Sequence, residues 1–128
     1  MRNKVQGLRT CIYTVADLMA AKEWYSRVFE TVPYFDERFY VGFNIAGYEL
    51  GLMPEVTATQ KSDNVLTYWG TEHIESVYKK FISAGASEHE APKNVGGDIV
   101  VASVKDPWNN VIGFIFNPSF SLEDPPMH

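Results

Sequence analysis

The chain contains an internal repeat, and this repeat limits its possible folds more than any other feature. Two segments have the apolar spacing of an amphipathic helix, "DLMAAKEWYSRVF" at 17–29 and "HIESVYKKFISAG" at 73–85. A short β-rich run precedes each helix pattern, and three strand patterns follow it. The predicted order is therefore strand, helix and three strands, twice. The apolar helix positions that correspond are Leu18, Ala21, Tyr25 and Val28 in the first copy and Ile74, Val77, Phe81 and Ala84 in the second.

The ends of the helices carry recognisable signals. Asp17 is placed to cap the first helix, Thr71 is predicted to cap the second, and Gly85 is predicted to end it. The last two strands of the second copy are joined by "DPWNN" at 106–110, a sequence typical of a tight turn. The second copy is longer than the first, and we expect its β-hairpin to hold the extra residues.

The repeat predicts a single α+β domain over residues 1–128. Its parts are a first module at about 8–54, a polar linker at 55–63, a second module at about 64–118 and a flexible tail at 119–128. One helix cannot cover both faces of its strands, so two βαβββ modules are expected to form a curved, cupped mixed sheet. The helices then lie on the convex face and leave the other face concave.

Strand alternation assigns residues to these two faces. In the first strand, Cys11, Tyr13 and Val15 are expected to face the helix, which places Thr10, Ile12 and Thr14 in the concavity. Leu66, Tyr68 and Gly70 take the concave side in the second copy, whereas Trp69 faces the helix. In "RFYVGFNIA" at 38–46 the apolar row Phe39, Val41, Phe43 and Ile45 is predicted to pack under the helices, and Tyr40 and Asn44 lie opposite.

Composition excludes several classes of partner. The formal net charge is −5 and the basic residues are scattered, so no concentrated basic face is available for nucleic acid. No segment approaches the roughly 20 apolar residues of a membrane span, which favours a soluble, cytoplasmic protein. The single cysteine, Cys11, lies in a strand pattern and is interpreted as a small buried hydrophobe.

The paired modules and two motifs resemble the vicinal oxygen chelate superfamily, which includes glyoxalase I, extradiol dioxygenases and bleomycin-resistance proteins. "IYTVADLMAAKEWYSRVF" at 12–29 is similar to the strand and helix that begin the family's modules, and "VKDPWNNVIGFI" at 104–115 is similar to its turn and last strand. The resemblance covers residues 8–118. It implies the fold but not the activity, because the superfamily contains lyases, oxygenases, transferases and binding proteins.

The resemblance also implies where a metal would be held. Metal-dependent members use a His or Glu at four positions, which fall here on Thr10, Glu49, Leu66 and Gly113. One carboxylate is too few, since a catalytic divalent site needs three protein ligands. We therefore predict no metal in the usual place and no cofactor. The three histidines, His73, His89 and His128, are interpreted as solvated polar residues.

Glu49 is the central residue of the predicted site. It is expected to act as a counter-charge for a cationic ligand or as a general base whose pKa is raised by apolar surroundings. It could equally be an exposed strand glutamate, or one paired with Arg9 or Arg38. Aromatic residues supply possible pocket walls with polar edges. The predicted ligand-binding residues are Thr10, Ile12, Tyr40, Glu49, Leu66, Tyr68, Trp108 and Gly113.

Three functions are compatible with these residues. The first is a metal-free protein that binds an aromatic or cationic small molecule in the concave cavity, completed by a homodimer. The second is a lyase or isomerase of glyoxalase type that uses Glu49 in a non-standard site. The third is a dimeric interaction module with a filled concavity, and whether the chain is an enzyme is left open at this point.

Overall fold

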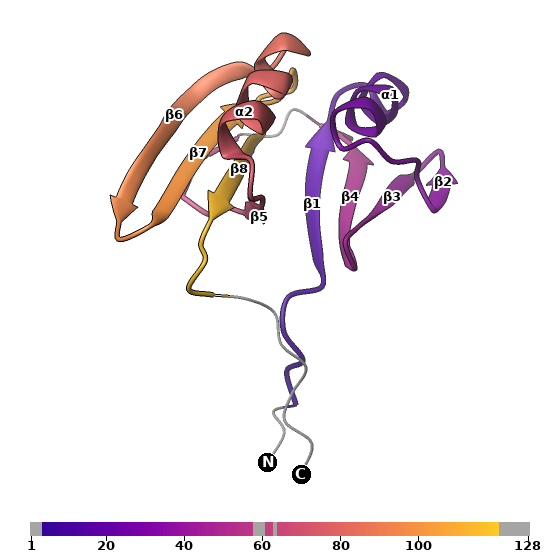
Figure 1. Ribbon diagram of the computed structural model, residues 1–128. Coiled ribbons are helices and arrows are strands. Elements are labelled where there is room, and N and C mark those ends of the chain that lie inside the picture. Colours follow the sequence, from indigo (N-terminus) through magenta and orange to yellow (C-terminus); the bar gives the residue numbers. More distant parts are fainter. Residues whose placement is uncertain (1–3, 58–60, 63, 121–128) are drawn as a thin grey trace. The chain divides into compact units, whose positions relative to one another are not determined.

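The computed structural model describes residues 4–57, 61–62 and 64–120 (Figure 1). It divides into two compact units, Met1–Ser62 and Asp63–His128. Parts of the predicted linker (58–60 and 63) and tail (121–128, with His128) lie outside the described residues. Within the described residues no helix has the length and apolar composition needed to cross a membrane.

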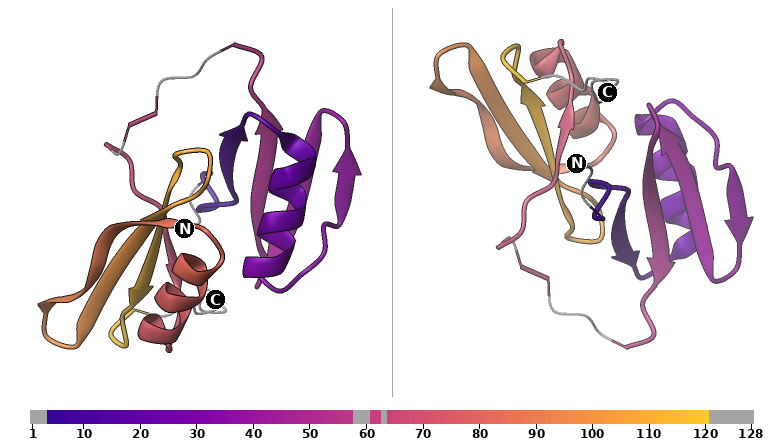
Figure 2. Two further views of the ribbon diagram at one scale, coloured as in Figure 1. Left: turned by 90° about the horizontal axis from the view of Figure 1, so that it is seen from above. Right: turned by 90° about the horizontal axis from the view of Figure 1, so that it is seen from below.

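The first unit has the predicted strand, helix and three strands. These elements are β1 (Thr10–Val15), α1 (Leu18–Val28), β2 (Phe35–Glu37), β3 (Tyr40–Ile45) and β4 (Tyr48–Pro54). The sheet has the order β1-β4-β3-β2, in which β1 pairs parallel to β4 and the other pairs are antiparallel. The helix covers one face of this sheet (Figure 2).

The second unit repeats this arrangement. Its elements are β5 (Tyr68–Gly70), α2 (Ile74–Ser83), β6 (Ser87–Gly96), β7 (Ile99–Lys105) and β8 (Val111–Phe116). The sheet order is β5-β8-β7-β6, again with one parallel pair at the edge. The βαβββ repeat and the α+β class are therefore confirmed. The extra length of the second copy lies in the β6–β7 hairpin, as predicted.

The helix ends agree with the sequence signals at all but one point. Asp17 accepts a hydrogen bond from the Ala20 amide at 3.1 Å, and Gly85 has φ +111° just after α2. The prediction for Thr71 is wrong: the N-cap of α2 is His73, and the Thr71 hydroxyl accepts the His73 amide at 3.0 Å. Thr71 thus stabilises the turn before the helix, because its side chain reaches the amide two residues ahead.

Each unit has its own core between its helix and one face of its sheet. In the first unit Tyr13 lies 5.9 Å from Tyr25 of α1, measured between ring centroids. In the second, Phe81 of α2 meets Phe114 of β8 edge to face at 4.7 Å. The alternation predicted for β1 is confirmed for Tyr13 and Val15, which are buried, and for Ile12, which is 49% exposed. Cys11, predicted to be buried, is only half-buried, because it lies near the start of this edge strand.

One core prediction is wrong. Phe39 is 64% exposed, whereas Val41 and Phe43 are buried as expected. The reason is local: β3 begins at Tyr40, so Phe39 belongs to the turn after β2 and does not follow the alternation of the strand. Its ring instead lies 6.0 Å from that of Phe35.

Candidate functional site

The first unit presents a cluster of polar side chains on the sheet face opposite α1. We call this the open face; it bears Thr10 and Ile12 of β1, Tyr40 and Gly42 of β3, and Glu49 and Gly51 of β4. Thr10 and Glu49 are direct partners in the register of β1 and β4. The Thr10 hydroxyl donates to Oε1 of Glu49 at 2.8 Å.

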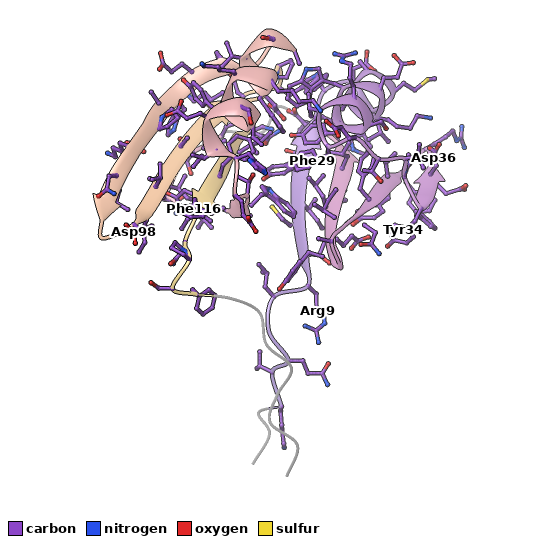
Figure 3. All side chains as sticks on the ribbon, viewed as in Figure 1. Arg9, Phe29, Tyr34, Asp36, Asp98 and Phe116 are labelled. Carbon is purple, nitrogen blue, oxygen red and sulfur yellow. The ribbon has the colours of Figure 1, made fainter. Side chains whose placement is uncertain are left out.

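A tyrosine that sequence reasoning missed holds the other carboxylate oxygen. The Tyr34 hydroxyl donates to Oε2 of Glu49 at 2.5 Å, and Figure 3 shows Tyr34 beside the β2–β3 end of the sheet. Its backbone amide bonds the Gly42 carbonyl at 2.9 Å. A Cβ on Gly42 would lie 2.8 Å from Oε2 of Glu49 and 3.0 Å from Cε1 of Tyr34. Glycine at 42 is therefore what allows the carboxylate and this ring to meet.

Tyr40 is the third hydroxyl at the carboxylate, and a second glycine makes room for it. A Cβ on Gly51 would overlap the Tyr40 hydroxyl and come within 2.6 Å of Cζ. Burial raises the pKa of Tyr40 to about 12, and its hydrogen bond to Glu49 adds to this. Tyr40 therefore stays protonated at neutral pH and can act only as a neutral hydroxyl.

These hydroxyls reverse one prediction about Glu49. The hydrogen bond from Tyr34 lowers the pKa of the Glu49 carboxyl, burial opposes this, and the bonds from Thr10 and Tyr40 lower it further. The predicted raised pKa is wrong because three hydroxyl donors outweigh the apolar surroundings. The two arginines do not pair with it: within the described residues no ion pair joins Glu49 to Arg9 or Arg38, and Arg9 donates to the Gln6 carbonyl at 2.7 Å.

We predict that Glu49 stays ionised to a pH below its ordinary pKa of 4.5. Because its pKa is lower in the folded state than in the unfolded state, the ionised form contributes stability above the unfolded pKa. That contribution is lost as the pH falls through the lowered folded value. Carbon NMR titration of the side-chain carboxyl measures the midpoint, and Tyr34→Phe should move it upward. A midpoint above 4.5 in the unchanged protein would contradict this assignment.

Aromatic rings lie close to one another at the β2–β3 hairpin, and one of them, Tyr34, bonds to the carboxylate. The Phe35 ring lies 6.4 Å from that of Tyr34, 6.0 Å from that of Phe39 and 6.1 Å from that of Tyr40, measured between centroids. Tyr34 and Phe39 are about two-thirds exposed, at 65% and 64%. We call these four residues the aromatic cluster. It places accessible ring surface beside a fixed negative charge.

The second unit has no carboxylate at the corresponding position. In the parallel edge pair Tyr68 lies opposite Gly113, as Thr10 lies opposite Glu49. The repeat alignment that selected Leu66 is therefore wrong in register. Fewer residues separate the edge strand from the helix in the second copy. Tyr68, which pairs with Gly113, is followed by α2 at Ile74, whereas Thr10, which pairs with Glu49, is followed by α1 only at Leu18.

The space beside Gly113 is already filled. A Cβ there would lie 2.7 Å from both the Thr67 carbonyl oxygen and Cδ1 of Tyr68. Leu66 precedes β5 and is 38% exposed, as is Tyr68. Gly113 therefore serves close packing of the edge strand and does not open a pocket by itself.

His89 is not the solvated side chain that the sequence suggested. Its Nδ1 lies 2.7 Å from Oγ of Ser103, and Ser103 is only 2% exposed. Ser103 pairs with Gly113 in the register of β7 and β8, so the serine lies on the sheet face opposite α2. The spacing of His89 and Ser103 along the sequence gave no signal of this contact, because a register shift in β6 brings them together.

Trp108 lies between β7 and β8, in the tight turn that was predicted at 106–110. The buried Asp106 carboxylate accepts the amides of Trp108 and Asn110, each at 2.8 Å. Asn109 takes a left-handed conformation with φ +69°, a role that asparagine tolerates. Asp106 is thus structural, and the half-buried Trp108 ring is held at a turn rather than on a strand.

The predicted site residues therefore fall into two groups. Thr10, Ile12, Tyr40 and Glu49 share the open face of the first unit. Leu66, Tyr68, Trp108 and Gly113 belong to the second unit. Tyr34 was missed because the strand pattern at 31–36 was not assigned to the two sheet faces; in the structure it lies directly before Phe35, which pairs with Gly42.

The residues present do not fit the metal-ligand set that the fold family implies. Hydroxyl donors already engage both oxygens of Glu49, and Gly113 has no side chain and no room for one. Among residues 4–57, 61–62 and 64–120, no group of three or more His, Cys, Asp or Glu side chains could hold a metal ion. The site must therefore be interpreted from its own hydroxyls, rings and single carboxylate.

Comparison with known proteins gives one family and many similar folds. The model of the Glyoxalase/Bleomycin resistance protein/Dioxygenase superfamily matches residues 7–114. No curated protein matches the chain.

Three solved structures illustrate the likeness. A glyoxalase-related enzyme from Fulvimarina pelagi has a TM-score of 0.77 at 15% identity, covering 93% of this chain and 94% of that one. A genomically encoded fosfomycin resistance protein from Listeria monocytogenes has 0.73 at 16%, covering 90% and 96%. A glyoxalase/bleomycin resistance protein from Albidiferax ferrireducens has 0.72 at 13%, covering 86% and 98%. At such identities the likeness shows the fold alone.

Proposed function

Because the chain belongs to the glyoxalase/bleomycin resistance protein/dioxygenase superfamily, we propose that it is a metal-free protein that binds a small aromatic cation. The ligand would lie on the open face of the first unit, with Glu49 as its counter-charge. Family membership supports a small-molecule site but leaves the ligand and any reaction open. The argument for a cation therefore comes from the residues of the open face.

The observation that carries the proposal is the fixed anion at Glu49. Hydroxyls of Thr10 and Tyr34 hold its two oxygens at 2.8 and 2.5 Å, which keeps the carboxylate ionised and oriented. The aromatic cluster lies beside it, and ring faces attract cations by about 0.5–2 kcal/mol each. The net charge of −5 adds a general attraction for positive ligands.

The alternative of a lyase or isomerase has less support from the geometry. A general base works best when its pKa lies near the working pH, whereas the hydroxyls lower the pKa of Glu49. The neighbouring tyrosines have raised pKa values, so neither supplies a phenolate at neutral pH. Binding by charge and ring contact needs neither a raised pKa at Glu49 nor a lowered pKa at the tyrosines.

Calorimetric titration with N-methylquinolinium and with quinoline tests the proposal. The two rings have the same shape, but only the first carries a permanent charge at neutral pH. We expect the cation to bind and the neutral ring to bind much more weakly or not at all. Equal affinity for both would contradict the role of the charge, and no binding of the cation would contradict the proposed function.

We predict that Glu49→Gln weakens N-methylquinolinium binding about tenfold, equivalent to about 1.4 kcal/mol. The amide keeps the size of the side chain but removes the negative charge. Glu75→Gln is the matched control, because Glu75 is an exposed residue of α2 and its loss changes the net charge equally. Unchanged affinity in Glu49→Gln, measured by the same titration, would show that Glu49 is only a strand carboxylate.

Three functional predictions from the sequence stay predictions. They are the homodimer, the cytoplasmic location, and the ligand contacts in a concave cavity of Leu66, Tyr68, Trp108 and Gly113. The proposal above requires only the first unit. Its experiments can therefore be interpreted whether or not the second unit contributes.

A further inference from the structure

We propose that the open face selects cations that have no N–H donors, such as quaternary ammonium or N-alkylated ring cations, over primary ammonium ions. This inference rests on the proposed function and names its ligand class more narrowly. It follows from how fully the Glu49 carboxylate is already hydrogen-bonded and from what surrounds it.

Part of the carboxylate's capacity for donors is already used. An ionised carboxylate offers about four lone-pair positions on its two oxygens. Thr10 donates to Oε1 at 2.8 Å and Tyr34 to Oε2 at 2.5 Å. About two positions therefore remain, and the missing Cβ atoms of Gly42 and Gly51 leave room for the Tyr34 and Tyr40 rings beside them.

A primary ammonium ion is poorly matched to such a site. It has three donors and is strongly hydrated, so it binds well only where several acceptors replace its water. Here its three donors would find about two free acceptor positions, unless it displaced the Tyr34 or Thr10 hydroxyl. A quaternary ammonium ion makes no hydrogen bonds and loses none, while the charge of Glu49 still attracts it.

The aromatic cluster provides the contact that such a cation needs. Phe35 has ring neighbours on three sides, at centroid distances between 6.0 and 6.4 Å, and Phe39 and Tyr34 expose most of their surface. Methyl groups around a positive nitrogen pack against ring faces, which is the usual way proteins recognise quaternary ammonium. Charge and ring surface therefore act together, without a hydrogen bond to the ligand.

Titration with benzyltrimethylammonium and benzylammonium tests the selectivity, because the two ligands differ only in the substituents on nitrogen. We expect the quaternary ion to bind at least about tenfold more tightly, and Glu49→Gln to weaken it. Equal binding, or tighter binding of benzylammonium, with both weakened by Glu49→Gln, would overturn this inference but leave the proposed function standing. Failure of both ions to bind would overturn the two together.

A second variant tests the cause of the selectivity. Tyr34→Phe keeps the ring but frees a lone pair on Oε2, so benzylammonium should gain affinity and the preference should shrink several-fold. Tyr48→Phe is the control, since Tyr48 is a β4 residue that is not among the hydroxyl donors to Glu49. If Tyr34→Phe leaves the ratio of the two affinities unchanged, occupied lone pairs do not explain the selectivity and the inference is wrong.

Discussion

Gly51→Ala is expected to weaken cation binding while the protein stays folded. The new methyl group would occupy the place of the Tyr40 ring end, against both the hydroxyl and Cζ. The ring is a side-chain end and can swing away, so we expect a stability loss of only about 1–2 kcal/mol. Binding should fall several-fold, up to about tenfold, because the Tyr40 ring leaves the aromatic cluster and its hydroxyl moves away from Glu49.

A double-mutant cycle shows whether this effect acts through Tyr40. In a Tyr40→Ala background the alanine at 51 meets no ring, so Gly51→Ala should then change neither stability nor affinity further. Chemical denaturation and the N-methylquinolinium titration provide the two readouts. Additive effects of the two substitutions would mean that Gly51 serves the strand itself rather than the placement of Tyr40.

Gly113→Ala is expected to have the larger effect on stability, a loss of about 3 kcal/mol. Here the new Cβ would lie 2.7 Å from the Thr67 carbonyl oxygen, a backbone atom that accepts the Gly113 amide at 3.0 Å. Relief requires the β5 edge strand to move, which weakens its pairing with β8. A glutamate at 113 would meet the same obstacle.

Two controls test whether the clash with the Thr67 carbonyl causes the effect of Gly113→Ala. Gly70→Ala in the same edge strand should be nearly neutral, because no atom lies within 4 Å of the added Cβ. Tyr68→Ala removes the ring part of the obstacle but not the carbonyl, so Gly113→Ala should stay destabilising in that background. Thermal and chemical denaturation measure both, and a stable Gly113→Ala protein would show that β5 adapts freely.

Much of the fold could be predicted because it depends on local patterns. Amphipathic spacing located both helices, Asp17 and Gly85 marked helix ends, and alternation in β1 assigned Tyr13 and Ile12 to the correct faces. Errors arose where the pattern was interrupted. Phe39 sits in a turn, and the shorter path into α2 shifted the pairing from Leu66 to Tyr68.

The candidate site was harder to predict, because its chemistry depends on contacts between strands. The family resemblance indicated Thr10 and Glu49, and strand alternation indicated Thr10 and Tyr40. Tyr34 could not be identified in this way, since it reaches the carboxylate from outside any strand. The direction of the Glu49 pKa was wrong for the same reason: apolar neighbours are visible in the sequence, whereas three converging hydroxyls are not.

The sequence by itself determined the βαβββ repeat, the family resemblance and the position of a single carboxylate, because each depends on the order and spacing of residues along the chain. Only the tertiary structure decided which groups contact that carboxylate and in which direction its pKa is shifted. Sheet register placed Thr10 against Glu49, and two glycines without side chains let the Tyr34 and Tyr40 rings lie across the sheet, where the Tyr34 hydroxyl bonds to Glu49. Hydrogen bonds between residues far apart in the chain thus orient the Glu49 carboxylate and lower its pKa.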